Sequence, residues 1–585
     1  MSGPLQQKDK FTPELRILAA SLLSMGVILL WAKYFGPKPP ANLPPQNRPA
    51  QTAPATPGAT ASPAVGNTQP PAAATAIAPA PAIAIKPQSA SEERSIVVEN
   101  DLYRVEISNR GAVVKSWQLK KYKDDNKPQR VLDVVHPEAS QQTGGWPFSV
   151  VLDDDQWQNA ANTGLYKISV DSNTLRAPAE VEFTWSDGHL EISKHLRFDH
   201  TYVVRVEASA KFNGNPIRAG LAWLGGFGDL TVTNPIPIET VSTFYSENGK
   251  LDSFPYKKLD GPDKWPAGLW QGGRDFAGIE DRYFVATFLP PNGAAPGTLA
   301  TRYWKTSRPI QVEGQQKEEP VPQVAAAGPP PSLALRVYVG PKDYDDLKKM
   351  NPPLHGLINF GWLEVISDPL FHGLKWLHGY IPNWGWAIVV LTLVINTLLF
   401  PLRISSYKTT LKMQRVAPEI KAIQERYKKY KLNDPKKQEM NKEVMAIYSR
   451  EGINPVGGCF QMFLQMPIWI GLNRALSYAI EMRHAPWLWV RDLSAKDPYY
   501  ILPVLMGLSM YLVSKMTPMT ATDPQQQTMM KIMPLTMAGM FMIMPISSGL
   551  AVYILTSSVV GIGQQWYLNR KHPVPVPVKP VRGKK

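Results

Sequence analysis

Cysteine is almost absent from this chain of 585 residues, which contains only Cys459. A single cysteine excludes an intramolecular disulfide, so each domain must be held together by its own core. The sequence also has no Gly-rich phosphate loop followed by Lys, and it therefore shows no nucleotide-driven energy source. Neither an internal repeat nor a pair of acidic residues in mid-membrane is present, and these are the features that would favour a transporter or channel.

Acidic residues are outnumbered, with 48 Asp and Glu against 63 Lys and Arg, which gives a net charge of +15. Residues 403–452 contain thirteen basic and six acidic residues, and residues 569–585 contain six basic residues and no acidic one. The mean hydropathy of -0.21 hides apolar segments beside these basic ones. Basic segments that flank membrane spans mark the cytoplasmic side, where we expect anionic lipid and ribosomal RNA as counter-surfaces, and no DNA.

The first apolar segment runs from Ile17 to Trp31 and follows Lys8, Lys10 and Arg16. A cleaved signal peptide has the same layout, but no small-x-small cleavage site follows the segment. We therefore expect residues 1–35 to be an uncleaved signal anchor and first transmembrane helix, with the N-terminus in the cytoplasm. Residues 36–94 are rich in Pro and Ala and have few bulky apolar side chains, which predicts a disordered periplasmic linker.

Residues 95–345 alternate apolar and polar side chains with a period of two, a pattern typical of antiparallel strands in an all-β sandwich. Residues 313–331, rich in Pro, Ala and Glu, are predicted to be a loop within it. No metal-ligand spacing and no nucleophile motif is found, so we expect neither an enzyme nor a metal site, although a sugar-binding or mutarotase-like enzyme remains an alternative. His195 and His200 are expected on strand surfaces. The expected strands are Leu102–Ile107, Val181–Trp185, Leu190–Ile192, Tyr202–Glu207, Arg282–Phe288 and Leu333–Val339.

The remaining residues predict a helical membrane region. Residues 346–382 contain apolar side chains at three- and four-residue spacing, which predicts an amphipathic helix on the outer membrane face. Together with the signal anchor, the later apolar segments give six spans and place both chain ends in the cytoplasm. The expected order is a second span at 383–402, a basic cytoplasmic helical hairpin at 403–455, spans three to six within 456–569, and a basic tail at 570–585.

The basic hairpin has two narrow apolar seams. In each half of the hairpin, apolar residues follow one another at alternating spacings of four and three, and the helix breaker Asn433-Asp434-Pro435 separates the two halves. This pattern predicts two antiparallel helices in contact along these seams. A charged hairpin without a partner is the alternative. The seam residues are Val416, Ile420, Ile423 and Tyr427 in the first helix and Met440, Val444 and Ile447 in the second.

Polar side chains inside the apolar segments are costly in hydrocarbon and are therefore candidates for function. Thr392, Asn396 and Arg403 fall on one stripe of the second span, together with Leu399. Gln461 and Gln465 share a face of the third span. Arg474 lies nearly opposite Gln465, and it either reaches the outer interface near Glu481 or lines the same cavity. The last span adds the polar residues Thr556, Ser557, Ser558, Gln564 and Gln565. Together these residues predict a polar cavity that is open to the cytoplasm. Its function would not require a chemical bond to be made or broken.

The run Asn454-Pro-Val-Gly-Gly-Cys-Phe-Gln-Met-Phe-Leu-Gln-Met-Pro467 resembles the YidC-type membrane protein insertases in their Gram-negative form. Matches at residues 481–486, 492–503, 522–527 and 545–549 support the resemblance. It implies insertion and folding of inner-membrane proteins through a lipid-facing hydrophilic groove, alone or with the Sec translocon. It also implies a β-domain similar to sugar-binding supersandwich folds, and a mobile cytoplasmic hairpin.

The resemblance also implies partners and a groove charge. The expected partners are nascent membrane proteins, the Sec translocon, anionic lipids, and a ribosome bound through the tail and the hairpin. We expect a monomer in the bacterial inner membrane, with no cofactor; a polytopic transporter or channel with a periplasmic binding domain is the alternative. The family usually carries an Arg where this chain has Asn396, and Arg403 and Arg474 are the two candidates to replace that charge.

Overall fold

The computed structural model describes most of residues 86–573. The predicted signal anchor, most of the linker and most of the basic tail lie outside the described residues, as does Cys459. Most of the predicted fifth span also lies outside them. The gaps between residues 86 and 573 are 232–240, 256–269, 313–314, 329–331, 359, 361–362, 431–433, 455–459, 519–531, 533–535, 537–538 and 543–545.

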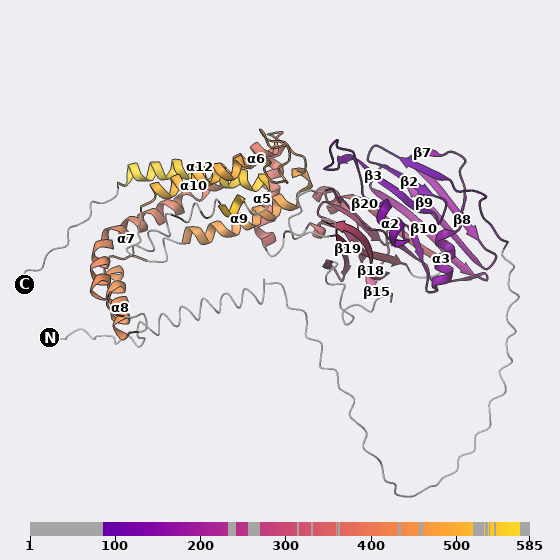
Figure 1. Cartoon of the computed structure of the whole chain (residues 1–585), viewed down its shortest axis with the longest axis horizontal. Helices are drawn as coiled ribbons and strands as arrows, with labels where there is room; N and C mark the ends of the chain where they lie inside the picture. The colour runs from indigo at the N-terminus through magenta and orange to yellow at the C-terminus, as the bar shows by residue number, and fades with distance from the viewer. Residues whose placement is uncertain are drawn as a thin grey trace, which may run out of the picture. The chain divides into compact units, whose positions relative to one another are not determined.

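The described strands form three sheets between residues 95 and 341 (Figure 1). The first has the order β4-β3-β2-β1-β7, and its strands are β1 (Ser95–Glu99), β2 (Tyr103–Ser108), β3 (Val113–Lys123), β4 (Val131–Asp133) and β7 (Thr174–Arg176). The third has the order β15-β18-β19-β12-β5, with strands β5 (Ser149–Val151), β12 (Gly220–Trp223), β15 (Gln271–Arg274), β18 (Leu299–Val312) and β19 (Gln315–Ala327).

The second and largest sheet has the order β14-β13-β16-β17-β20-β10-β9-β8-β6, with β11 beside β10. The described strand pairings in this sheet are antiparallel, and several of them join strands that are consecutive in the sequence. Its strands are β6 (Lys167–Ile168), β8 (Ala179–Ser186), β9 (Leu190–Phe198), β10 (Val203–Phe212), β11 (Asn215–Pro216), β13 (Ser242–Glu247), β14 (Lys250–Pro255), β16 (Phe276–Glu280), β17 (Phe284–Leu289) and β20 (Ser332–Pro341).

The alternating sequence of these strands becomes an alternation of burial. In β9, every second side chain from Leu190 to Phe198 is buried, because successive side chains of a strand point to opposite faces. His195 lies on the outer side of β9, as expected, whereas His200 lies in the turn that follows. Each of the six strands expected from the sequence overlaps an observed one, so the β-rich organisation is confirmed.

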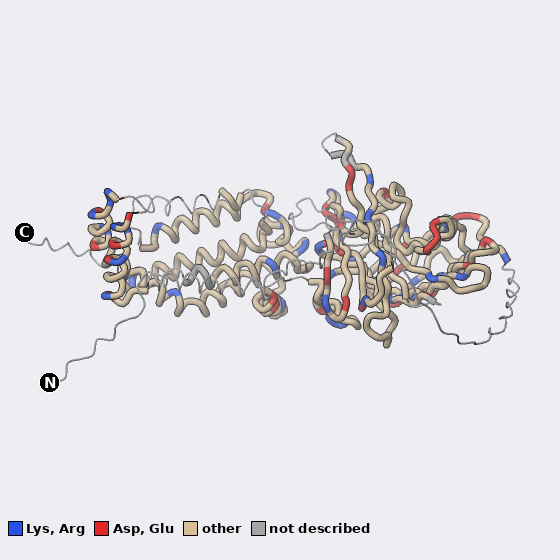
Figure 2. The backbone as a smooth tube through the Cα atoms, turned by 90° about the horizontal axis from the view of Figure 1, so that it is seen from below, with Lys and Arg blue, Asp and Glu red and all other residues tan. Residues whose placement is uncertain are grey.

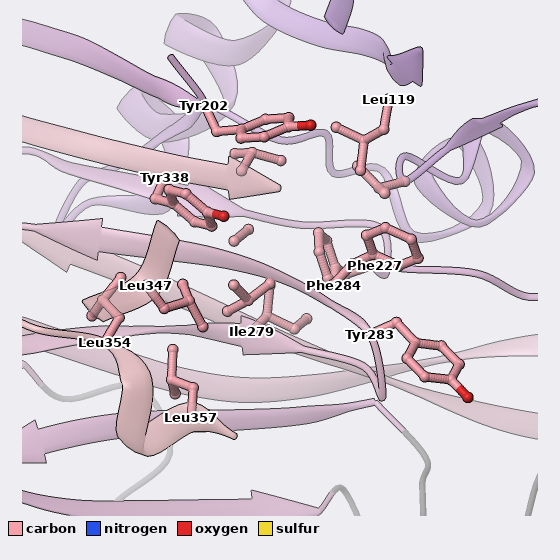
Figure 3. Close-up of a cluster of buried hydrophobic side chains, with 14 of the residues drawn as sticks. Leu119, Tyr202, Phe227, Ile279, Tyr283, Phe284, Tyr338, Leu347, Leu354 and Leu357 are labelled. Atoms are coloured by element: carbon pink, nitrogen blue, oxygen red, sulfur yellow. The ribbon is translucent and has the colours of Figure 1, made fainter. Parts of the chain in front are cut away.

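Two short helices, α2 (Pro137–Thr143) and α3 (Asp155–Thr163), are also part of the β-rich region. After β20 the chain forms α4 (Tyr344–Lys349) and η2 (His355–Leu357). Figure 3 shows Leu347, Leu354 and Leu357 from this segment beside Ile279 and Tyr338 of the sheet. The end of the β-rich region is thus fixed to its core by leucines.

The prediction of a loop at residues 313–331 is wrong. Most of this segment is strand β19, which pairs with β18 over its full length. Pro320 and Pro322 do not break the strand because they lie where β19 has a neighbour on one side only; β12 pairs with β19 at Val324–Ala326 and not at the prolines. Proline lacks a backbone N–H and is tolerated at such an open edge.

The helical region comprises seven described helices longer than two turns. Among the described residues no single helix is long and apolar enough to cross a membrane, but α6 and α7 together meet that criterion, with a bend of 53° between them. Figure 2 shows charged residues concentrated on α7 and α8, with few along the other helices of this region. The helices are α5 (Glu364–His378), α6 (Trp384–Leu398), α7 (Phe400–Arg426), α8 (Pro435–Arg450), α9 (Phe460–Tyr478), α10 (Ile501–Met516) and α12 (Ser548–Lys571).

The helix expected to continue from residue 383 to 402 ends instead at Leu398. Pro401 is in the first turn of the next helix, and because it has no N–H it cannot continue the hydrogen-bond ladder of α6. Leu399 separates the two helices, and the chain changes direction there.

Helices α7 and α8 pack along an apolar cluster of their own. Val416, Ile420 and Ile423 of α7 are buried with Ile447 of α8, and Ile453 completes the cluster. Tyr427, Met440 and Val444, which the sequence also assigned to the seams, pack against this cluster. Arg450 and Glu419 form an ion pair across the two helices, 2.7 Å between Nη2 and Oε2.

Candidate functional site

Helix α12 carries a row of polar and small residues on one face. Tyr553, Ser557, Gly561 and Gln564 follow one another at spacings of four, four and three, which places them on one side of a helix. At 1.5 Å per residue the row is about 16 Å long. We name these four residues the α12 polar stripe, because each of them contacts a polar side chain of another helix.

Asn396 of α6 contacts two residues of the stripe, Ser557 and Gln564. The Ser557 hydroxyl donates to Oδ1 of Asn396 at 3.3 Å, and the Gln564 amide donates to the carbonyl of Asn396 at 3.2 Å. The Asn396 amide donates back to the carbonyl of Thr392 at 2.9 Å. Thr392 is buried and donates to Ile388 in its own helix. Two of the candidates from the second span thus differ. Asn396 joins two helices, whereas Thr392 bonds within its own helix.

Arg403 of α7 reaches the end of the stripe that carries Gly561 and Gln564. Its Nη1 donates to Oε1 of Gln564 at 2.9 Å, and its Nη2 donates to the carbonyl of Gly561 at 3.2 Å. A Cβ at position 561 would lie 3.3 Å from Nη1, so the small residue leaves room for the guanidinium. Among the described residues Arg403 forms no ion pair. The guanidinium is half-buried, and its described partners are neutral oxygens.

Gln465 of α9 binds the other end of the stripe, donating to the hydroxyl of Tyr553 at 2.8 Å. The side chain of Gln461 lies outside the described residues. The structure thus brings residues of three helices, Asn396, Arg403 and Gln465, onto α12. The sequence analysis missed Tyr553 and Gly561, although the spacing along the last span was a signal for them.

Arg474 lies elsewhere on α9 and contacts its own helix. Its Nη1 donates to the hydroxyl of Tyr478 at 3.3 Å, and the guanidinium lies 6.0 Å from the centre of that ring. Glu481, named as a possible partner for Arg474, instead pairs with Lys375 of α5 at 3.2 Å. The described contacts of Arg474 are therefore separate from the α12 polar stripe.

A second polar cluster joins the end of α9 to the β-rich region. Nε of Arg282 donates to the carbonyl of Ser477 at 2.7 Å, which places a cation at the C-terminus of α9, where the helix dipole favours positive charge. Arg483, five residues after α9 ends, donates to the carbonyl of Lys123 at 2.8 Å and pairs with Asp229. The sequence analysis missed this cluster because no pattern links residues so far apart.

Asp281 holds the β-rich side of that cluster in place. Its carboxylate accepts hydrogen bonds from the backbone N–H groups of Asp229, Tyr283 and Phe284, at 2.7, 2.8 and 2.6 Å. Burial raises the pKa of Asp281, and these N–H donors oppose that effect. One carboxylate thus orders both the segment that carries Asp229 and the segment that follows Arg282.

Comparison with known proteins covers nearly the whole chain. Residues 95–373 match the family described as YidC periplasmic domain, and residues 376–574 match 60Kd inner membrane protein. A membrane protein insertase YidC of Citrifermentans bemidjiense is 34% identical over 95% of this chain and 99% of its own length. Another, of Syntrophus aciditrophicus, is 29% identical over the same shares. A solved active YidC insertase is 17% identical over 83% of this chain and 95% of its own, with a TM-score of 0.34. The chain belongs to the YidC family of membrane protein insertases.

Proposed function

We propose that this insertase receives the hydrophilic part of its client in a groove beside the α12 polar stripe. The observation that carries the proposal is the convergence of Asn396, Arg403 and Gln465 on that stripe. Polar groups inside hydrocarbon are costly, and Asn396, Arg403 and Gln465 each bond to a neighbouring helix. A client's polar segment that exchanged bonds with these groups would cross a shorter apolar distance.

Arg403 supplies the positive charge of the groove in this proposal. The chain has Asn396 at the position where relatives are expected to carry Arg, and Gln564 connects Asn396 to the guanidinium of Arg403. A half-buried cation that bonds to neutral oxygens keeps much of its attraction for an incoming carboxylate, because the surrounding dielectric constant is below that of water. Clients with acidic N-terminal tails are therefore the proposed preferred substrates.

The proposed topology has six spans and a groove that opens to the cytoplasm, with α7, α8 and the basic tail on that side. The positive charge of residues 403–452 supports this orientation, since basic segments flanking spans stay in the cytoplasm. The same charge supports contact with a ribosome and anionic lipids, while the β-rich region forms a sandwich in the periplasm. Action alone or beside the Sec translocon, as a monomer, completes the proposal.

The test compares two arginines in cells that depend on this chain. Arg403→Gln is expected to reduce insertion of a single-span client with an acidic N-terminal tail at least about fivefold, and Arg403→Lys is expected to retain most of it. A client with a neutral tail should insert at the normal rate in each case. Lys408→Gln, an exposed change on the same helix, is the matched control.

Arg474→Gln completes the experiment. If Arg474→Gln, and not Arg403→Gln, impairs insertion of the acidic client, then the groove charge lies on α9 and the assignment to Arg403 is wrong. Photo-crosslinkers placed at Asn396 and Gln465 should also capture a stalled nascent chain. A dry, unreactive environment at both positions would exclude the groove itself.

A further inference from the structure

Three potential metal ligands meet where the α9–α10 connection contacts the β-rich region. Asp125 follows strand β3, whereas His484 and Asp492 belong to the connection between α9 and α10. One ligand atom from each residue lies within 4.8 Å of the other two. All three residues are half-buried, so they are partly withdrawn from water but still reachable by a small ion.

Two carboxylates face one imidazole in this cluster. Nε2 of His484 lies 2.7 Å from Oδ1 of Asp125. Oδ1 of Asp492 accepts hydrogen bonds from the backbone N–H and the hydroxyl of Ser494, at 2.8 and 2.7 Å, which fix the orientation of the carboxylate. Two negative charges at this separation repel each other unless a cation lies between them.

The neighbouring arginine only partly compensates these charges. Nη2 of Arg483 lies 3.7 Å from Asp125, but the same nitrogen pairs more closely with Asp229. Among the described residues Asp492 forms no ion pair. Gln129 completes the surroundings, with its amide nitrogen 3.5 Å from Nε2 of His484. The carboxylates of Asp125, Asp492 and Asp229 therefore share one arginine, Arg483, which leaves the cluster with an excess of acidic groups.

We propose that Asp125, His484 and Asp492 bind one divalent transition-metal ion, with Zn²⁺ as the preferred ion. Tetrahedral Zn²⁺ with ligand atoms at about 2.0 to 2.1 Å requires them to lie about 3.3 Å apart. The ligand atoms observed within 4.8 Å of one another reach that geometry through small side-chain movements. Water fills the fourth position, as in zinc sites with three protein ligands.

The chemistry of the ligands selects the metal class. An imidazole nitrogen with two carboxylates suits Zn²⁺ and its neighbours in the first transition row, whereas Mg²⁺ prefers oxygen ligands in an octahedral arrangement.

The bound ion joins Asp125 of the β-rich region to two residues of the helical region. It therefore strengthens the same junction that Arg483 and Arg282 form. No sequence pattern revealed the site, because Asp125 and His484 are 359 positions apart.

The test measures metal binding by the purified full-length protein in detergent. Equilibrium dialysis against Zn²⁺ alone, followed by elemental analysis, is expected to give one ion per chain. His484→Gln and Asp492→Asn should each weaken binding at least about tenfold, a loss typical even for changes outside the ligand set itself. The matched controls are His189→Gln and Asp187→Asn, exposed residues of the β-rich region, which should leave affinity unchanged.

A structural readout separates this site from other zinc-binding side chains. Zn²⁺ should slow backbone hydrogen exchange in residues 484–493 of the unmodified protein and not in His484→Gln. Mg²⁺ at the same concentration should have no effect. The proposal is overturned if the protein binds no stoichiometric Zn²⁺, if the variants bind it as well as the controls do, or if Mg²⁺ produces the same protection.

Discussion

Arg483 and Asp229 are 254 positions apart in the sequence and form a buried ion pair that joins the helical region to the β-rich region. Their side chains are 4% and 1% exposed. The guanidinium also lies 5.8 Å and 5.4 Å from the ring centres of Tyr283 and Phe284. This pair, with the hydrogen bond from Arg282 to Ser477, fixes the end of α9 against the β-rich region.

Arg483→Gln is expected to loosen that junction. The substitution leaves Asp229 buried without its cation, and loss of one partner from a buried pair typically costs about 3 to 5 kcal/mol. Hydrogen exchange of residues 479–493 in the full-length protein should accelerate by about 100-fold or more, since 1.36 kcal/mol corresponds to a factor of ten. Arg491→Gln, an exposed change in the same connection, is the control. Equal exchange in the two variants would show that the pair contributes nothing to docking.

Gly228→Ala should destabilise the β-rich region. Its backbone has a φ of +98°, and an added Cβ would lie 2.2 Å from Oδ2 of Asp281, a carboxylate fixed by three backbone N–H groups. Gly249→Ala is the matched control, because its φ is +72° and no atom lies within 4 Å of its added Cβ. We expect a cost of about 1 to 2 kcal/mol for the control from the backbone alone, and at least about twice that for Gly228→Ala. Pulse proteolysis gives the urea midpoint of unfolding for each variant, and we expect a lower midpoint for Gly228→Ala than for Gly249→Ala. Similar midpoints for the two variants would contradict the steric argument.

Lys194 should make the β-rich region more stable as the pH rises. The side chain is fully buried and donates to the carbonyls of Gly111, Ala112 and Phe148 at 2.7, 3.0 and 2.8 Å. Burial lowers the pKa of Lys194 from 10.5 to about 7. Between these two values the unfolded chain binds a proton that the folded chain does not, so the free energy of unfolding increases with pH in that window.

Lys194→Met gives the reference that cannot titrate. It should be less stable at pH 7 by about 2 kcal/mol or more, because the hydrogen bonds that the amino group donates to these carbonyls, three when it is charged and two when it is neutral, are lost. The difference between the two proteins should widen from pH 7 to about pH 9.5, as read from urea midpoints. The upper limit avoids ionisation of the tyrosines in the unfolded chain, near pH 10. A difference that stays constant or narrows over this range would mean that Lys194 stays charged in the folded state.

Ile420→Asp should separate α7 from α8. Ile420 is 3% exposed at the centre of the apolar cluster between these helices, and both the lost apolar contacts and the buried charge oppose packing. We expect a cost of about 3 kcal/mol or more, enough to open a two-helix contact of this size. Ala422→Asp introduces the same charge at an exposed position of α7 and should leave the contact intact. Hydrogen exchange across residues 413–427 distinguishes the two outcomes, and unchanged protection in Ile420→Asp would refute the packing assigned here.

The strands were predictable because burial on one face of a sheet imposes a period of two on the sequence, as in Leu190–Phe198. Strand β19 was not predictable in this way, because its prolines are a local signal that favours a loop. The open edge that tolerates Pro320 and Pro322 depends instead on where β12 ends, which is a property of the sheet. Asn396 and Gln465 could be selected as site candidates because polar side chains stand out in apolar segments. Their common partner, helix α12, could not be predicted from the sequence. Helix spacing shows which residues share a face, but it does not show which helix that face contacts.

By itself the sequence determined the family, the β-rich and helical halves, and the set of polar residues available to a groove. Each of these follows from local order along the chain, namely periodicity, composition and contiguous motifs. Tertiary structure alone decided that Arg403 turns onto Gln564 after the bend at Leu399, that Arg483 lies against Asp229, and that Asp125 meets His484. Those contacts join segments more than 150 positions apart, and their geometry is set by how whole elements pack, which no local pattern encodes.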